Sequence, residues 1–309
     1  MGSHSDIDGI DYGTLDIKTV CECNKCLSTK TLHPLATLIN LEKTEIRNEA
    51  VKFEFYAILL IEDCPGGCSC CGRKYYDYAN ATMVFLTPGD IFRMTGDNTL
   101  PDKGWLLAFH PDLLHSTTLD SHIRNYTFFW YRKEEALHLS VRETATVTCC
   151  LENIETELHH PIDSHTATIL SRHIELMLDY CSRFYERQFI TRENTNKDIM
   201  KRLDRMTEDW ILHRTTGTAK SQPAPECFSR SLGLSQAYFK DLLKFETGKT
   251  FEEYYLTRQL DEARRMLLRT DSSPATIADR LGFSSTQFFC AIFKKLTGKS
   301  PADYRTSMN

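Results

Sequence analysis

The chain has 309 residues, of which 41% are hydrophobic and 26% are charged, and its formal net charge at pH 7 is −5. This composition is ordinary for a globular protein and excludes a collagen-like or wholly disordered chain, while the length suits two domains. No run of 18 apolar residues is present, and the polar start Met1-Gly2-Ser3-His4 lacks the apolar stretch of a signal peptide. We therefore expect a cytoplasmic protein with no membrane partner.

The charge is distributed unevenly along the chain. Residues 1–200 contain 19 Lys and Arg against 29 Asp and Glu, whereas residues 201–309 contain 18 against 13. A basic C-terminal third on an otherwise acidic chain indicates that this third binds a polyanion.

The first part of the chain has the pattern of β-structure. Short segments that alternate or run apolar lie at 51–55, 56–61, 83–86, 104–109 and 126–131. They are bounded by turn signals such as Thr87-Pro88-Gly89-Asp90. Such a series predicts an antiparallel barrel or sandwich, compatible with a cupin-like barrel.

From about residue 140 the hydrophobic period becomes helical. Val147, Leu151, Ile154 and Leu158 form one stripe, a second begins at Leu170, and a third includes Leu203 and Trp210. The middle helix also carries apolar residues outside its stripe, which are Ile169, Leu176, Phe189 and Ile190. Packing within the monomer and pairing with a partner both explain this excess. Residues 215–225 are rich in small residues and Pro and have no apolar period, which predicts a linker.

The C-terminal stretch contains an internal near-repeat. Leu232-Gly233-Leu234-Ser235 returns as Leu281-Gly282-Phe283-Ser284, and Glu246-Thr247-Gly248-Lys249 returns as Leu296-Thr297-Gly298-Lys299. The offset is 49 residues at the first match and 50 at the later one. Each copy predicts a short helix, a turn at the glycine, and a second helix capped by Ser235 or Ser284. In the second copy the expected buried side is Phe288, Phe289, Ile292, Phe293 and Leu296.

A long helical pattern separates the two copies. A helix over 252–268 is about 25 Å long at 1.5 Å per residue. Successive major grooves on one face of DNA lie about 34 Å apart. A rigid tandem pair of helix-turn-helix units can therefore enter two successive grooves.

The second copy resembles the signature of the AraC/XylS family. The matching residues are Ile277 to Ser284, Phe289, Phe293-Lys294-Lys295, Gly298-Lys299-Ser300-Pro301 and Tyr304-Arg305. The resemblance implies an α+β multidomain protein, with a cupin-like effector-sensing domain at 5–140 and a helical dimerisation and relay segment at 141–214. The expected organisation ends with the linker at 215–225 and an all-α tandem helix-turn-helix domain at 226–309. It implies a sequence-specific transcriptional regulator that is no enzyme and needs no cofactor. Its partners would be promoter DNA, a small effector, a second copy of the chain and RNA polymerase.

The same resemblance assigns the DNA-binding residues. They are Gln236, Ala237, Lys240, Asp241, Lys244, Arg258, Ser285, Thr286, Gln287, Cys290, Lys294 and Lys295. Gln287 suits adenine and Lys240 suits guanine, whereas Lys244, Arg258, Lys294 and Lys295 suit phosphates.

Two positions depart from the expected DNA-binding pattern. Ala291 stands where the family often has Arg, and Asp241 puts a negative charge on the first reading face. A solvated surface explains any single residue of this set equally well.

Two cysteine clusters allow another chemistry. Cys21-Glu22-Cys23-Asn24-Lys25-Cys26 is one, and Cys64, Cys68, Cys70 and Cys71 form the other. Thiols at these spacings bind soft metals or sense oxidants, although neither cluster has the paired C-x2-C units of a zinc module. Three alternatives remain: a regulator that senses oxidants or soft metals through these cysteine thiols, a loop with incidental cysteines, and a metal-dependent cupin enzyme. The histidines lack the H-x-H pattern of metal-binding cupins, and no effector-binding residue is assigned.

Overall fold

The structure, a computed structural model, describes residues 13–43, 50–62, 71–93, 103–215 and 223–308. The chain divides into two compact units, Met1–Arg192 and Glu193–Asn309. This division lies between two helices, whereas the sequence predicts a linker at 215–225. Residues 216–222 of that linker lie outside the described residues.

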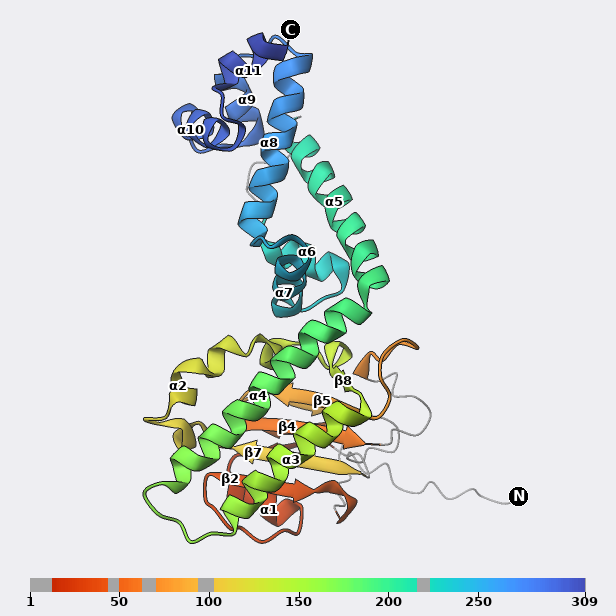
Figure 1. The fold of residues 1–309 in the computed structure, drawn as a ribbon, viewed down its shortest axis with the longest axis vertical. Coiled ribbons are helices and arrows are strands. Elements are labelled where there is room, and N and C mark those ends of the chain that lie inside the picture. Colours follow the sequence, from red (N-terminus) through yellow and green to blue (C-terminus); the bar gives the residue numbers. More distant parts are fainter. Residues whose placement is uncertain (1–12, 44–49, 63–70, 94–102, 216–222, 309) are drawn as a thin grey trace, which may run out of the picture. The chain divides into compact units, whose positions relative to one another are not determined.

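The N-terminal unit contains two β-sheets (Figure 1). One sheet has the order β2-β7-β4-β5-β8, with strands Ala36–Asn40, Gly104–Phe109, Tyr56–Glu62, Ala81–Leu86 and Leu137–Leu139. The other has the order β1-β3-β6, with strands Thr14–Ile17, Ala50–Phe53 and Ile91–Arg93. All pairs are antiparallel except β1 with β3, which is parallel. Over the described residues the two sheets do not join into a closed barrel, so the expected barrel is replaced by two open sheets.

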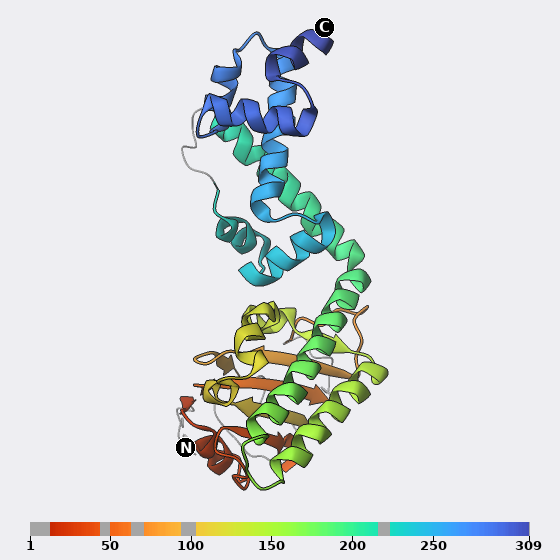
Figure 2. The ribbon, with the colours of Figure 1, turned by 60° about the vertical axis from the view of Figure 1, so that its left-hand side comes forward.

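Two apolar cores follow from the alternation of side chains along the strands. Phe53, Leu59 and Leu106 belong to a core that combines residues of both sheets. The opposite face of the five-stranded sheet is covered by α3 (Val141–Leu158) and α4 (Thr166–Thr191), which lie across it in Figures 1 and 2. Ile58 and Leu107 meet Ile154 and Ile174 there. The first two helical stripes predicted from the sequence are confirmed.

The segment 126–131 is not a strand, contrary to the prediction. It follows the short helices α2 (Thr118–His122) and η4 (Ile123–Asn125), and it forms a 3-10 helix at Thr127–Trp130. This turn still buries Phe128 and Phe129, whose rings stack 5.8 Å apart in the core. A run of aromatic residues satisfies burial in either conformation, so periodicity alone does not separate the two.

His138 of β8 is a fully buried histidine beside an ion pair. Its Nδ1 lies 3.1 Å from Thr82 Oγ1, and its Nε2 has no hydrogen-bond partner in the described structure. Asp77 and Arg192, both buried, pair at 2.7 Å. Burial lowers the pKa of His138 to about 4, because the nearby Asp77 only partly offsets the loss of water.

This lowered pKa predicts that the N-terminal unit loses stability in acid. Between pH 6.5 and about 4 the unfolded chain binds a proton that the folded state excludes, so stability falls as the pH falls. The expected loss from pH 7 to pH 5 is about 2 kcal/mol. Urea unfolding at both pH values checks it, with His138→Gln as the comparison. An equal pH dependence in the two proteins would show that His138 is not the cause.

The C-terminal unit is helical over its described residues. Its helices are α5 (Glu193–Thr215), α6 (Pro225–Leu232), α7 (Gln236–Thr247), α8 (Phe251–Arg269), α9 (Pro274–Leu281), α10 (Thr286–Thr297) and α11 (Pro301–Met308). Phe228, Phe239, Phe251, Phe289 and Phe293 lie in one shared core. No helix in the described part of the chain is both long enough and apolar enough to cross a membrane.

Candidate nucleic-acid interface

Helices α6 and α7 form the first helix-turn-helix unit. α6 ends at Gly233, whose φ of 76° is in the left-handed region that glycine adopts readily. Ser235 then caps α7, with its Oγ accepting from the backbone N of Tyr238 at 3.1 Å. Both features confirm the prediction for this copy.

Helices α9 and α10 form the second unit, with one correction to the predicted cap. Gly282 ends α9 at φ 75°, as expected. The cap of α10 is Ser285, not Ser284, because the Oγ of Ser285 accepts from Phe288 N at 3.1 Å. Ser235 and Ser285 are 50 residues apart, so the extra residue of the second copy lies in the turn before the cap.

The exposed face of α10 contains two residues, Phe288 and Leu296, that the sequence predicts on its buried side. Phe289 and Phe293 are buried, but Phe288 is 47% exposed and Leu296 is 53% exposed. Phe288 therefore stands beside the exposed Gln287 on the outer face. Its equivalent in the first unit, Tyr238, is only 3% exposed. Helical periodicity does not predict the exposure of Phe288, because position 288 lies at the edge of the apolar stripe.

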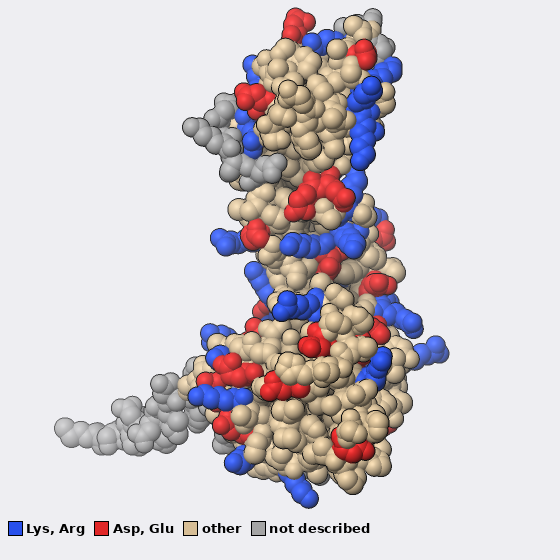
Figure 3. Space-filling view, turned by 90° about the vertical axis from the view of Figure 1, so that its left-hand side faces the viewer, with Lys and Arg blue, Asp and Glu red and all other residues tan. Residues whose placement is uncertain are grey.

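The predicted reading residues lie on the outer faces of α7 and α10 or at their caps. Lys240, Lys244, Ser285, Gln287, Lys294 and Lys295 are exposed, whereas Gln236, Ala237, Asp241, Thr286 and Cys290 are half-buried. Figure 3 faces the side on which Figure 1 labels α10, and there basic and acidic side chains border a broad uncharged area of the C-terminal unit. The arrangement offers polar and apolar groups to a groove, with cations at its edge.

Two predicted residues already have partners inside the unit. The guanidinium of Arg258 on α8 forms an ion pair with Asp204 and lies 5.2 Å from the ring centre of Tyr254. The side-chain amide of Gln236 donates to Glu226 of α6. Each must exchange its present partner to reach DNA, so their contact with DNA stays a prediction.

Helix α5 belongs to this unit, although the sequence predicts it as part of the relay segment at 141–214. Leu203 and Ile211 are buried in the shared core. Arg202 Nη2 donates to Ser231 O of α6 at 3.1 Å, and Asp204 accepts from Tyr254 Oη of α8. The guanidinium of Arg214 lies over the turn at Gly282, where an added Cβ would approach it within 1.8 Å. One helix thus contacts both helix-turn-helix units and the helix that connects them.

The described cysteines do not converge on a site. On α1 (Val20–Cys26), Cys21 is half-buried, Cys23 is buried and Cys26 is exposed, so their thiols point in different directions. Burial raises the pKa of Cys23 to about 12, which keeps its thiol protonated and unreactive. Cys71 is buried, while Cys64, Cys68 and Cys70 lie outside the described residues. Among the described residues, no group of three His, Cys, Asp or Glu is placed to hold a metal ion.

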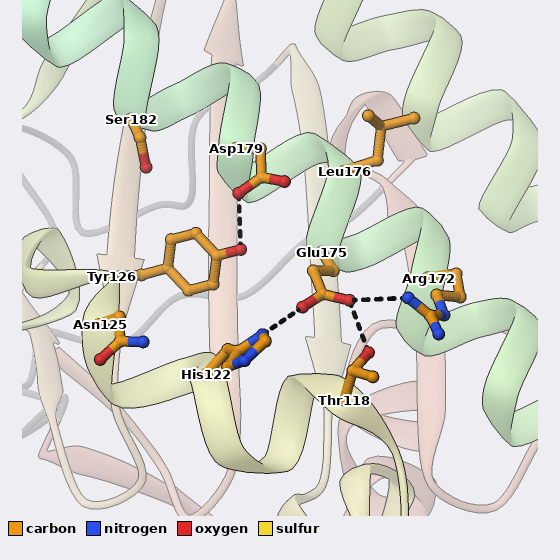
Figure 4. Close-up of a pocket in the computed structure, with 9 residues that line it drawn as sticks. All are labelled: Thr118, His122, Asn125, Tyr126, Arg172, Glu175, Leu176, Asp179 and Ser182. Atoms are coloured by element: carbon orange, nitrogen blue, oxygen red, sulfur yellow. Dashed lines mark hydrogen bonds and ion pairs between the residues drawn. The ribbon is translucent and has the colours of Figure 1, made fainter.

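A polar pocket of about 640 Å³ lies in the N-terminal unit, between α2 and α4 (Figure 4). His122 Nδ1 lies 2.9 Å from Glu175 Oε1, and Thr118 donates to Glu175 Oε2 at 2.7 Å. Tyr126 Oη donates to Asp179 at 2.8 Å. These side chains largely satisfy one another's hydrogen-bonding groups. Their bonds hold α2 against α4 and leave few polar groups for a ligand.

Comparison with known proteins identifies the C-terminal unit. Residues 228–307 match the family model described as helix-turn-helix domain. The regulatory protein PocR of Salmonella typhimurium is 37% identical over 76 residues, which cover 25% of this chain and 25% of PocR. The xylose operon regulatory protein of Escherichia coli K12 is 31% identical over 75 residues, or 24% of this chain and 19% of that protein. Residues 228–307 therefore form a helix-turn-helix domain similar to those of AraC/XylS-type regulators.

The matches cover only part of these relatives, because the chain spans between 21% and 30% of the first three. Among solved structures, the DNA-binding domain of AdpA with a target DNA covers 35% of this chain and 90% of its own length, at 23% identity and TM-score 0.30. ToxT of Vibrio cholerae covers 88% of this chain and 97% of its own, at 13% identity and TM-score 0.31. Scores this low establish no shared overall fold.

The corrected cap yields a matched pair of variants. Ser285→Ala removes the acceptor for Phe288 N and should cost about 1 kcal/mol of unfolding free energy, whereas Ser284→Ala should cost a few tenths at most. Thermal or urea unfolding of the full chain compares them. Equal losses, or a larger loss for Ser284→Ala, would contradict the cap assignment.

Proposed function

We propose that this chain is a sequence-specific DNA-binding transcriptional regulator that responds to a small effector and acts in the cytoplasm. The observation that carries the proposal is the pair of serine-capped helices, α7 and α10, whose outer faces expose lysines and Gln287. Lysines supply phosphate affinity, and amide and apolar groups read bases.

The connecting helix fits this role in length. Its 19 residues span about 28 Å, close to the 34 Å between successive major grooves. Contacts from α5 and α8 to both helix-turn-helix units support a fixed separation of α7 and α10. One chain would then cover two successive grooves on one side of the duplex.

We assign sensing to the N-terminal unit, as a cupin-like domain, and contact with RNA polymerase to the assembled complex. Two facing sheets with a shared core are compatible with a cupin-like origin. The matched relatives are named as transcriptional regulators, which favours regulation over the cupin-enzyme alternative. The separated thiols of α1 give the thiol-sensor alternative less support than the effector reading.

A second copy of the chain is the partner we assign to α4. Ile169, Leu176 and Ile190 are 37%, 48% and 63% exposed, and they are spaced by seven and fourteen residues. A heptad interval keeps apolar residues on one seam facing a partner helix. Phe189, expected outside the buried stripe, is instead buried in the monomer.

This seam predicts a homodimer that depends on Leu176. Leu176→Glu should raise the dimer dissociation constant by at least about tenfold, because a carboxylate would be buried at the contact. Sedimentation equilibrium measures it. Leu212→Glu is the control, since Leu212 is 60% exposed on α5, outside the seam. A monomeric parent protein, or equal effects of the two variants, would refute the assignment.

The DNA face predicts two kinds of variant. Lys294→Ala with Lys295→Ala should weaken binding to all sequences and reduce the salt slope by about one for each phosphate left unneutralised. Gln287→Ala should cost about 1–3 kcal/mol and relax specificity at one base pair. Duplexes selected from a random library by the full chain supply the target. Lys201→Ala, 68% exposed on α5, is the control. Unchanged affinity and slope in the lysine variant would refute this DNA face.

A further inference from the structure

The N-terminal unit contains a second cavity, separate from the pocket of Figure 4. It lies between the end of α3, the edge strand β2 and the segment that joins α1 to β2, and its volume is about 550 Å³. The residues that line it include Lys30, Leu38, Trp105, Glu155, Leu158 and His159. Ligand sites in proteins have this size and are mostly apolar, with a few placed polar groups.

The floor of the cavity is apolar. Leu38 of β2 and Trp105 of β7 rise from the face of the sheet that α3 covers, and Leu158 descends from α3. Leu38 and Trp105 pack against the main core yet remain half-buried. Their remaining exposed surface therefore faces the cavity, where an apolar ligand would remove it from water.

One wall of the cavity is held by a buried polar network. Asn24 is fully buried and accepts from Thr37 Oγ1 at 2.7 Å, while its Nδ2 donates to Thr31 Oγ1 at 3.1 Å. The backbone carbonyl of Asn24 accepts from Thr29 N at 2.7 Å. Ser28 holds a φ of 54°, which a residue with a Cβ rarely adopts. A wall fixed by several bonds and one strained residue is pre-formed, as a binding site requires.

The charged end of the cavity is negative. Glu155 lies in the last turn of α3, which ends at Leu158 and has no basic residue in that turn, so no cation within the helix balances its negative pole. His159 Nδ1 lies 2.8 Å from Glu155 O, which holds the imidazole at the helix end. Lys30 also lines the cavity, but its side chain is exposed and its long stem lets the ammonium extend into water.

We propose that this cavity binds a small amphipathic amine. Its aromatic or aliphatic body lies against Leu38, Trp105 and Leu158, and its ammonium group points to Glu155 and the carbonyl end of α3. The regulatory meaning of this site rests on the proposed function, whereas binding itself is measured without DNA.

Three probes with the same body test the proposal. Full-length protein is titrated calorimetrically with 2-phenylethylamine, 2-phenylethanol and 3-phenylpropionate, which differ mainly in charge. The amine should bind about five- to tenfold more tightly than the alcohol, and the carboxylate more weakly than both.

Variants separate the two parts of the site. Trp105→Ala should weaken the binding of the amine and of the alcohol alike, by about tenfold. Glu155→Gln should lower the affinity for the amine to that for the alcohol and leave the affinity for the alcohol unchanged. Glu152→Gln is the matched control, because Glu152 is exposed on the same helix and does not line the cavity. Since Glu155 is only half-buried, its variant tests the site even if Trp105→Ala fails to fold.

Absence of amine binding up to millimolar concentration would overturn the proposal. So would tighter binding of the carboxylate, or equal amine affinity in Glu155→Gln and Glu152→Gln. Failure of the full chain to bind any selected duplex, by contrast, would overturn the regulatory function and leave the amine site standing.

Discussion

The aromatic core around α8 is the constraint on which the geometry of the two proposed DNA-reading helices, α7 and α10, depends. The ring of Phe251, at the start of α8, lies 5.1 Å from the ring of Phe228 and 5.9 Å from that of Phe239. These contacts join the first helix-turn-helix unit to α8. Further along, the buried Gln259 Nε2 donates to Leu281 O at 2.8 Å and joins the second unit. Because close-packed cores resist gradual deformation, α7 and α10 are held at one separation.

Helix α5 adds a second support along the same core. Asp204 of α5 holds Arg258 in an ion pair. Burial first, and the hydrogen bond to Asp204 second, raise the pKa of Tyr254 to about 12. Arg214 covers the turn at Gly282, where only a glycine leaves room for its guanidinium. α5 begins directly after Arg192, the residue that the buried pair with Asp77 fixes in the N-terminal unit.

The repeat, its turns and its glycines were predictable because each has a local cause. Gly233 and Gly282 end helices in the left-handed conformation, and Ser235 caps α7 as its sequence position indicates. The choice between Ser284 and Ser285 was not predictable, because either hydroxyl suits a cap and the turn length decides. The exposure of Phe288 likewise depends on which neighbours cover the stripe edge. The stripe of α5 was visible, but its partner was not, since periodicity gives a buried face without naming what buries it.

In the N-terminal unit the central strands were predictable from their apolar runs, whereas the edges were not. β4, β5 and β7 are buried over nearly all positions, so their sequences are strongly biased. β1, β6 and β8 have three or four residues each, too few for an alternating pattern to stand out. The cavity beside α3 was also invisible, because its residues come from four separate chain segments that only the fold brings together.

Hydroxyl-radical footprinting of the full chain on a selected duplex tests the central claim most directly. A rigid tandem pair should give, for each bound chain, two protected patches on the same face of the duplex, about one helical turn apart. A single protected patch for each chain, or two patches on opposite faces, would contradict a rigid tandem pair.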